Sequence, residues 1–187
     1  MSYETYLEAL RPRMGERRRK HSIAVCREAV RLARKYGADP EKAETAGILH
    51  DICKETPDAE QLRILSDFGI MLTSVEKKEP KLYHAMSGSV YIQQQLAVSD
   101  PDIVNAVRYH TTARAGMSLL EKVLYLADYT SADRDYPGVT EMRELVEIGI
   151  LPAMEFALRF TVSDLCERGR CIHPDTISAY NEVMLSK

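Results

Sequence analysis

The 187-residue sequence has no run of roughly 18 apolar residues, the length needed to span a bilayer. Its first twenty residues carry scattered charge and lack the apolar stretch of a secretory signal. The four cysteines form no Cys-x-x-Cys pair, which favours reduced thiols over a disulfide framework or a zinc knuckle. The formal net charge is only -3, so no positive excess points to nucleic acid or an acidic membrane as partner. We therefore expect a soluble, cytoplasmic protein.

Strand-like alternation is almost absent, and apolar residues recur at helical spacing instead. This pattern predicts helices over residues 16–36, from 40 through the segment GILHDICK at 47–54, and over 57–68, 82–96, 101–110 and 118–130. Two more helices are predicted within 139–170, broken near Gly149 and Pro152, and a short one from Pro174, whereas 70–81 is predicted as a loop with a short turn. No repeat or linker interrupts the chain, so we predict one all-α domain over residues 1–187, a helical bundle.

Residues that begin and end helices support these boundaries. Gly37 is suited to end the helix over 16–36. Asp39-Pro40 supplies an N-cap followed by proline at the first helical position, and Thr56-Pro57 repeats that pair. Ser118 and Glu121 have the spacing of a capping box.

Six titratable side chains fall on the apolar faces of these predicted helices. Taken singly, each has an ordinary explanation, because a buried histidine is usually hydrogen-bonded in the core and an inward aspartate usually caps a loop or pairs with an arginine. Taken together, the six side chains need a different explanation, because four of only five histidines point inward and an unpaired buried carboxylate costs several kcal/mol. Neutral imidazole and carboxylate are the ligands that divalent metals prefer. The predicted metal ligands are His21, His50, Asp51, His84, His110 and Asp128.

Six ligands exceed the three that a single catalytic zinc uses. They suit two ions roughly 3.5–4 Å apart, an arrangement that generates hydroxide and holds a phosphoryl group during in-line displacement. Asp51 is the natural bridging ligand because it neighbours His50 and lies amid the set. The predicted metal-binding core covers residues 16–135, followed by C-terminal helices over 138–187.

The order of these residues resembles the HD-domain metal-dependent phosphohydrolases, and more narrowly the YqeK-type symmetrical bis(5'-nucleosyl)-tetraphosphatases. The resemblance covers nearly the whole chain. It is carried by RRKHSIAV at 18–25, AGILHDICK at 46–54, RYHTTARAGM at 108–117, LYLADYTSADRDYPGV at 124–139 and IHPDTISAYN at 172–181. A lone HD dipeptide is weak, but the ordered set is specific.

The resemblance implies an all-α HD-type bundle that hydrolyses diadenosine tetraphosphate symmetrically, with a bridging water or hydroxide attacking phosphorus to give two ADP. It further implies a homodimer and an iron-like metal pair, for which manganese, cobalt and zinc remain alternatives because the same ligands accept them. One ion would take His21, His50, Asp51 and Asp128, and the other Asp51, His84 and His110.

Other residues near the ligands in sequence are predicted to act on an anionic substrate. Asp51 and Lys54 are the predicted catalytic residues, Lys54 because it follows the HD pair closely and can stabilise developing charge. The predicted substrate-binding residues are Arg18, Lys54, Thr111, Thr112, Arg114 and Arg134.

This sequence departs from the family pattern at two positions. Ala113 stands where the family often has glycine, and Thr130-Ser131-Ala132 replaces an Ile-Glu-Pro run. Because the glutamate is absent, the sequence gives less reason to expect that this loop orients the substrate or the nucleophile. Every metal ligand is present, so hydrolysis remains the expectation.

Three alternatives remain open. An enzyme of the same fold could act on nucleoside mono-, di- or triphosphates or on a cyclic dinucleotide. A non-catalytic helical protein could use metal for stability or sensing. A basic run could bind RNA, although aromatic residues beside it are too sparse for base stacking and a solvated helix face is expected instead; it comprises Arg11, Arg13, Arg17, Arg19 and Lys20. His173 is predicted to be structural or at the surface.

Overall fold

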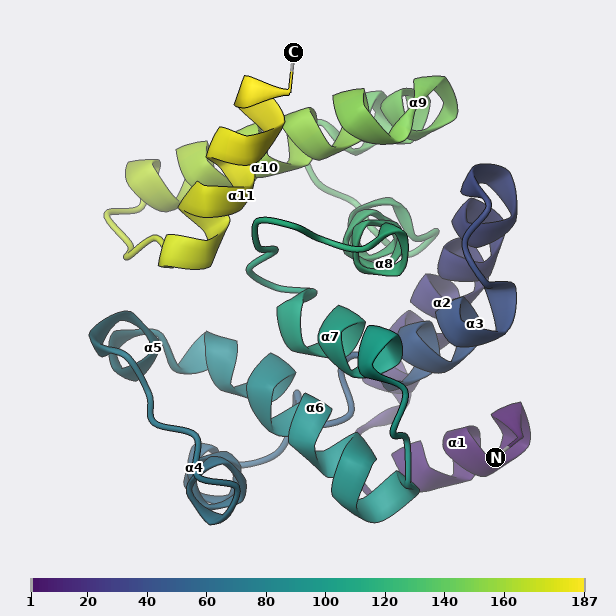
Figure 1. The fold of residues 1–187 in the computed structure, drawn as a ribbon. Coiled ribbons are helices and arrows are strands. Elements are labelled where there is room, and N and C mark those ends of the chain that lie inside the picture. Colours follow the sequence, from purple (N-terminus) through teal and green to yellow (C-terminus); the bar gives the residue numbers. More distant parts are fainter. Residues whose placement is uncertain (1, 187) are drawn as a thin grey trace.

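The computed structural model describes residues 2–186, and within that range it contains helices and no strands (Figure 1). The all-α prediction is confirmed. The α-helices are α1 (Tyr3–Leu10), α2 (Glu16–Tyr36), α3 (Pro40–Leu49), α4 (Asp58–Asp67), α5 (Ser74–Lys78), α6 (Tyr83–Leu96), α7 (Pro101–Tyr109), α8 (Leu119–Thr130), α9 (Val139–Ile148), α10 (Ile150–Glu167) and α11 (Pro174–Leu185), with a 3-10 helix η1 at Pro80–Leu82.

Helix α8 lies at the centre of the bundle. It packs against α2 and α3 on one side, α7 on another, and α9 and α10 on a third (Figure 1). Helices α6 and α7 pack together below it in this view, and α4 covers α6. Three of the predicted ligand segments, in α2, after α3 and in α8, are therefore brought to one place by direct helix packing.

A glycine lets α2 and α3 approach closely. A Cβ atom at Gly47 would lie 2.7 Å from the Cα of Cys26, a backbone atom that cannot move aside cheaply. Only glycine fits this crossing without displacing one helix. The close approach holds the start of the HD segment against α2, the helix that carries His21.

Most predicted helix ends are confirmed. Gly37 ends α2 with a φ of 82°, in the left-handed region that favours glycine. The Asp39 carboxylate accepts hydrogen bonds from two backbone N–H groups in the first turn of α3, where Pro40 is the first residue. Ser118 and Glu121 form the expected capping box of α8.

Other boundaries differ from the predictions. Helix α3 ends at Leu49, so the prediction that this helix continues through GILHDICK is wrong. Residues 50–55 form successive turns instead. Helix α1 was not predicted, and the segment 70–81 contains α5 and the first two residues of η1. Pro152 lies in the first turn of α10, and Gly149 alone separates α9 from α10.

Thr56 does not cap α4, because Pro57 occupies the N-cap position. The Thr56 hydroxyl instead accepts a hydrogen bond of 2.8 Å from Arg13, which also pairs with Glu60. Arg13 was expected on a solvated face, and it lies over the Tyr91 ring with most of its side chain buried. The Thr56 hydroxyl thus serves a contact between distant parts of the chain and not the predicted cap of α4.

The cysteines are free, with Cys26 and Cys53 buried and Cys166 and Cys171 exposed, as expected of reduced thiols. Among the described residues, no helix combines the length and the apolar character needed to cross a bilayer.

Candidate metal centre

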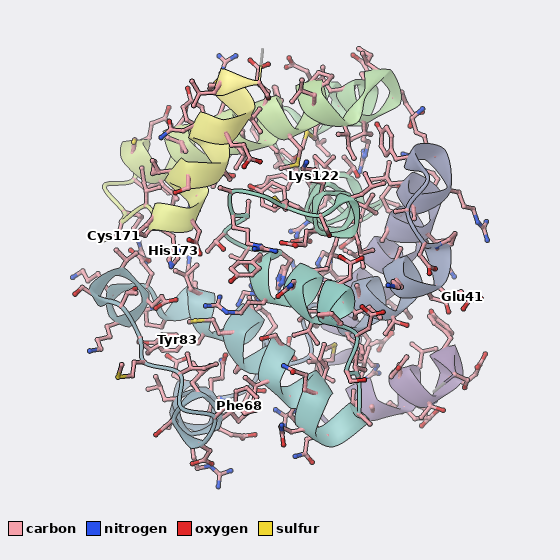
Figure 2. All side chains as sticks on the ribbon, in the orientation of Figure 1. Glu41, Phe68, Tyr83, Lys122, Cys171 and His173 are labelled. Atoms are coloured by element: carbon pink, nitrogen blue, oxygen red, sulfur yellow. The ribbon has the colours of Figure 1, made fainter. Side chains whose placement is uncertain are left out.

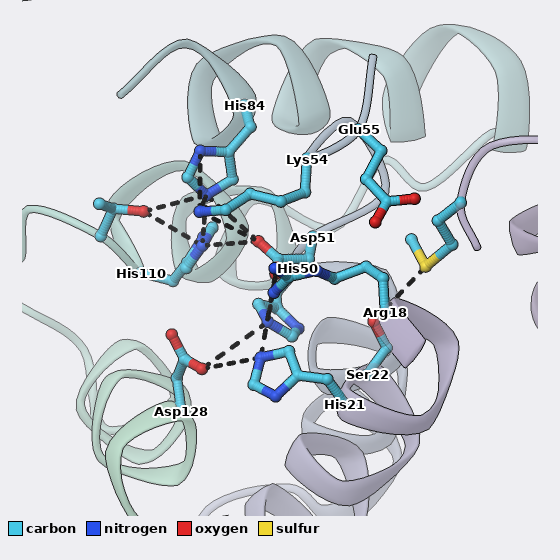
Figure 3. A network of polar contacts seen from close by, with 12 residues as sticks. Arg18, His21, Ser22, His50, Asp51, Lys54, Glu55, His84, His110 and Asp128 are labelled. Atoms are coloured by element: carbon cyan, nitrogen blue, oxygen red, sulfur yellow. Dashed lines mark hydrogen bonds and ion pairs between the residues drawn. The ribbon is translucent and has the colours of Figure 1, made fainter. Parts of the chain in front are cut away.

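The six predicted ligands meet in one buried cluster, although they come from five separate segments (Figure 3). His21 lies on α2, and His50 and Asp51 lie in the turn after α3. His84 lies in the first turn of α6, His110 directly follows α7, and Asp128 is in the last turn of α8. All are buried except Asp128, whose side chain is 18% exposed. The sequence-based set is thus brought together in space.

Asp51 lies between two pairs of imidazoles. Its Oδ1 is 3.2 Å from His84 Nε2 and 3.6 Å from His110 Nε2. Its Oδ2 faces the other pair, 3.6 Å from His50 Nε2 and 3.9 Å from His21 Nε2. A carboxylate that presents one oxygen to each pair has the geometry of a bridging ligand.

Asp128 completes the set on the His21 side. Its Oδ1 is 3.1 Å from His21 Nε2 and 4.0 Å from His50 Nε2 (Figure 3). Potential ligand atoms form three overlapping groups: two contain Asp51, one with His21 and His50 and one with His84 and His110, and a third joins His50, His110 and Asp128.

The hydrogen bonds behind the imidazoles fix their tautomers. Three of the histidines donate Nδ1–H to the backbone carbonyl three residues earlier, at 2.8 Å for His50, 2.6 Å for His84 and 2.7 Å for His110. His50 and His110 follow helix ends, where the last carbonyls have no helical partner. Because a carbonyl can only accept, each Nδ1 carries the proton in the neutral ring and each Nε2 presents a lone pair.

The converging lone pairs require a positive charge between them. The Nε2 atoms of His84 and His110 are 3.1 Å apart, although both are acceptors in these tautomers. Buried Nε2 atoms of His21 and His50 and the Oδ1 of Asp51 have no hydrogen-bond partner. An unsatisfied buried polar group costs about 1–3 kcal/mol, and a divalent metal ion removes that cost at several atoms together. The residues present fit a divalent-metal site.

The protonation states of His50, His84 and the two carboxylates also suit metal binding. Burial lowers the pKa of His50 and of His84 to about 4, despite the nearby carboxylates, so both rings are neutral at pH 7. The pKa of Asp51 lies well below its usual value although burial would raise it, and the Arg18 guanidinium, which donates a hydrogen bond of 2.8 Å to Oδ2, favours the ionised form. The pKa of Asp128 is likewise lowered, because His21 and Arg134 outweigh the effect of burial. Neutral imidazoles and ionised carboxylates are the forms that bind metal.

Comparison with known proteins agrees with this geometry. The model of the HD domain family matches residues 18–133, which include all six ligands. The chain belongs to the HD domain family. Symmetrical bis(5'-nucleosyl)-tetraphosphatases from Bacillus subtilis (strain 168) and Halalkalibacterium halodurans are 38% and 35% identical to it, over 97% of this chain and 97% and 96% of theirs.

A solved structure has the same fold along the whole length. The crystal structure described as a "predicted HD superfamily hydrolase involved in NAD metabolism" from Clostridium acetobutylicum matches with a TM-score of 0.96 at 34% identity. The match covers 100% of this chain and 99% of that one. Helices α9–α11 lie outside residues 18–133, the part that the family model matches, and this relative has them in the same arrangement.

Three cations lie beside the ligands of this HD domain. Arg18 donates a hydrogen bond of 2.8 Å to Asp51 Oδ2, and Arg134 donates to the Asp128 carboxylate and to its backbone carbonyl. The Nζ of Lys54 is 3.1 Å from His84 Nε2 and 4.0 Å from Asp51 Oδ1. The structure thus brings these three predicted substrate-binding residues to the cluster.

The three residues predicted after His110 have different positions. The Thr111 hydroxyl is 3.1 Å from His110 Nε2 and 3.3 Å from His84 Nε2. Thr112 is buried beside it, with its hydroxyl donating to the Ala113 carbonyl. Arg114 instead makes two hydrogen bonds of 2.7 Å to Glu121, so its guanidinium is held at the start of α8 and not at the ligand cluster.

Asp133, which holds the His21 ring, was not among the residues predicted from the sequence. Its Oδ2 accepts a hydrogen bond of 2.8 Å from His21 Nδ1, and its Oδ1 accepts one from the Ser131 hydroxyl. Asp133 follows α8 in a loop without periodicity, so no pattern marked it. His173 caps α11 and lies 3.4 Å from Glu76, which fits the structural role predicted for it.

Proposed function

We propose that this HD domain hydrolyses diadenosine tetraphosphate symmetrically, giving two molecules of ADP. The names of the full-length relatives in Bacillus and Halalkalibacterium support this substrate. The observation that carries the proposal is the position of Asp51, whose two oxygens each face a separate pair of imidazoles. Such a pair of sites is typical of phosphoryl hydrolases.

The ligands divide between the two ions. We propose that His21, His50, Asp51 and Asp128 hold one ion and that Asp51, His84 and His110 hold the other. When bound, the metal ions lower the pKa of water and polarise phosphoryl oxygen. Iron is the metal that the family resemblance favours. A homodimer is proposed on the same ground, and the cytoplasmic location stays a prediction from the sequence.

The basic side chains around the ligands would bind the substrate and stabilise the charge that develops on it. Hydrolysis breaks the central P–O–P bond, adds the oxygen of water to one inner phosphorus, and leaves the bridging oxygen on the second ADP. Negative charge develops on that leaving phosphate. Lys54 and Arg134 border the same cavity as His110 and Asp128, where they can bind phosphoryl oxygens and stabilise this charge. Arg18 supplies positive charge on the Asp51 side.

Product analysis tests the proposal directly. The purified chain, freed of metal and reloaded with iron or manganese, is offered diadenosine tetraphosphate, nucleoside mono-, di- and triphosphates and a cyclic dinucleotide in parallel. We expect ADP as the sole nucleotide product from diadenosine tetraphosphate and much slower turnover of the others. AMP together with ATP would contradict symmetrical cleavage.

The Asp51→Ala variant supplies the matched control. It should lose both metal loading and turnover, because the bridging ligand is common to both ions. Turnover at the wild-type rate by this variant would remove Asp51 from the proposed site. A metal-loaded wild-type chain that hydrolyses none of the nucleotides would instead support a structural or sensing role for the metal.

A further inference from the structure

Three adjoining cavities cross the ligand cluster. The central cavity, of about 270 Å³, is bordered by Lys54, His110 and Asp128. A second, which we call the Arg17 cavity, has a volume of about 390 Å³ and is bordered by Arg17 and His21. The third, the Leu165 cavity, has a volume of about 410 Å³. Both outer cavities have the size of small-molecule sites.

Shared walls connect the three spaces in a row. Arg134 and Tyr136 border both the central cavity and the Arg17 cavity. Thr111 and Tyr129 border both the central cavity and the Leu165 cavity. The central cavity, which the ligands His110 and Asp128 border, thus has a larger cavity on each side, and the two outer cavities have similar volumes.

The Leu165 cavity is built from elements distant in sequence. It lies between η1 and the loop that joins α10 to α11, where Figure 2 shows Cys171 and His173 near the start of α6 at Tyr83. Arg170 in that loop pairs with Glu79, and the Cys171 N–H donates to the same carboxylate. These contacts hold the two walls together.

The walls of the Leu165 cavity suit a nucleoside. Leu82 and Leu165 offer apolar surface to a base, and the ammonium of Lys81 and the carboxylate of Asp164 offer polar groups to a sugar or base edge. The part of the wall formed by Thr112 is held in place by α11, because the Thr176 hydroxyl donates a hydrogen bond of 2.7 Å to the Thr112 carbonyl. A mostly apolar cavity with a few polar groups is typical of small-molecule sites.

We propose that the Leu165 cavity is a nucleoside subsite for one end of a symmetrical dinucleoside polyphosphate, and that the other half of the same molecule extends into the Arg17 cavity. The inference rests on the proposed function, which places the broken bond at the middle of the substrate. A substrate cleaved at its midpoint needs room for equal halves on both sides of the ligand cluster. The row of cavities provides that room within a single chain.

Filling the Leu165 cavity tests the subsite. The Leu165→Trp variant adds an indole to the partly exposed wall of the cavity, away from every metal ligand. Its matched control is Leu151→Trp, on the same helix α10 and 42% exposed, which does not border the cavity. Equilibrium dialysis of the metal-loaded chain with ADP measures the number of nucleotides bound per chain. We expect two for the wild type and for Leu151→Trp, and one for Leu165→Trp.

Kinetics give a second readout. For diadenosine tetraphosphate, Leu165→Trp should raise KM by about tenfold or more. For adenosine 5'-tetraphosphate, which has one nucleoside and can use the Arg17 cavity, its KM and kcat should stay within about twofold of the wild type. Retained activity on this substrate also shows that the variant is folded.

The outcomes separate the subsite from the proposed function. A wild-type chain that binds ADP in two sites but hydrolyses nothing would remove the function and keep the subsite. One ADP per wild-type chain, or two in Leu165→Trp, would overturn the subsite whatever the activity. An equal rise in KM for both tetraphosphates would also overturn it, because the substitution would then act on the ligand cluster in general.

Discussion

His21 differs from the other three ligand histidines in the group that accepts the hydrogen bond from its Nδ1–H. Those three donate Nδ1–H to a carbonyl three residues earlier, and two of them do so just after a helix end. His21 lies within α2, where the carbonyls are occupied by helical hydrogen bonds. A carboxylate from the loop after α8, that of Asp133, takes the place of a free carbonyl. A carboxylate behind a ligand imidazole fixes its orientation and raises its basicity.

We predict that Asp133→Asn weakens binding of one metal ion. The amide can still accept from His21 Nδ1 but lacks the negative charge, so affinity at the His21 position should fall roughly 10–100-fold. Competition titration of the metal-free chain against a fluorescent chelator measures it. The other ion should bind as before. Asp135→Asn, two residues further along the same loop, is the control, and equal affinities in the two variants would refute the role given to Asp133.

At the scale of single elements, helix ends that depend on neighbouring residues were predictable. The Gly37 end, the Asp39 cap and the Ser118 capping box follow from local hydrogen bonding, and the structure confirms each. The end of α3 at Leu49 was not predictable, because apolar periodicity continues through 47–54 while the chain turns there. Thr56 was predicted to cap α4, but Pro57 is the N-cap, and the Thr56 hydroxyl accepts from Arg13, 43 residues away in sequence, a contact that no local pattern predicts.

The end of α6 carries a strained residue. Ala97 has a φ of 50°, in the left-handed region that costs a residue with a Cβ roughly 1–2 kcal/mol, and it is exposed. Ala97→Gly should therefore raise the free energy of unfolding by about 1 kcal/mol and the Tm by roughly 2–4 °C.

Differential scanning calorimetry and urea unfolding both measure this change. The same substitution at Ala59, exposed within α4, is the control and should lower the free energy of unfolding by roughly 0.5–1 kcal/mol, since helical backbone gives glycine no advantage. A loss of stability at both positions would show that the φ of Ala97 carries no strain.

At the scale of the whole molecule, convergence of the six ligands could be predicted without knowing how the helices pack. Buried imidazoles and carboxylates in one small domain need a common cation, so their number alone implied one site. The pairing of Arg114 with Glu121 and of His21 with Asp133 could not be predicted, because these contacts depend on the relative positions of loops. The Leu165 cavity likewise arises only from the packing of α10 and α11 on the rest of the fold.

Burial of neutral histidines makes the metal-free fold sensitive to acid. The pKa of His50 and His84 is about 4 in the fold, because burial disfavours the charged ring, against 6.5 for an ordinary histidine. Between these values the unfolded chain binds more protons than the folded one. The free energy of unfolding should therefore fall as pH is lowered from 6.5 towards 4, by about 1.4 kcal/mol per pH unit for each histidine.

Urea unfolding of the chelated chain at pH 7, 6 and 5 measures this dependence. The His84→Gln variant should lose about half of it, since one of the two titrating groups is removed. A free energy of unfolding that stays constant or rises between pH 6.5 and 5 would contradict the assignment of both rings as neutral in the fold.

In the proposed metal centre, Asp51 bridges two metal ions held by six side chains of one chain. Electron paramagnetic resonance during Mn²⁺ titration of the metal-free protein tests this claim most directly, because ions joined by a shared carboxylate couple their spins. We predict saturation at two Mn²⁺ per chain with a coupled signal, and loss of that signal in Asp51→Ala. Saturation at one ion, or two ions with independent six-line spectra, would contradict the claim.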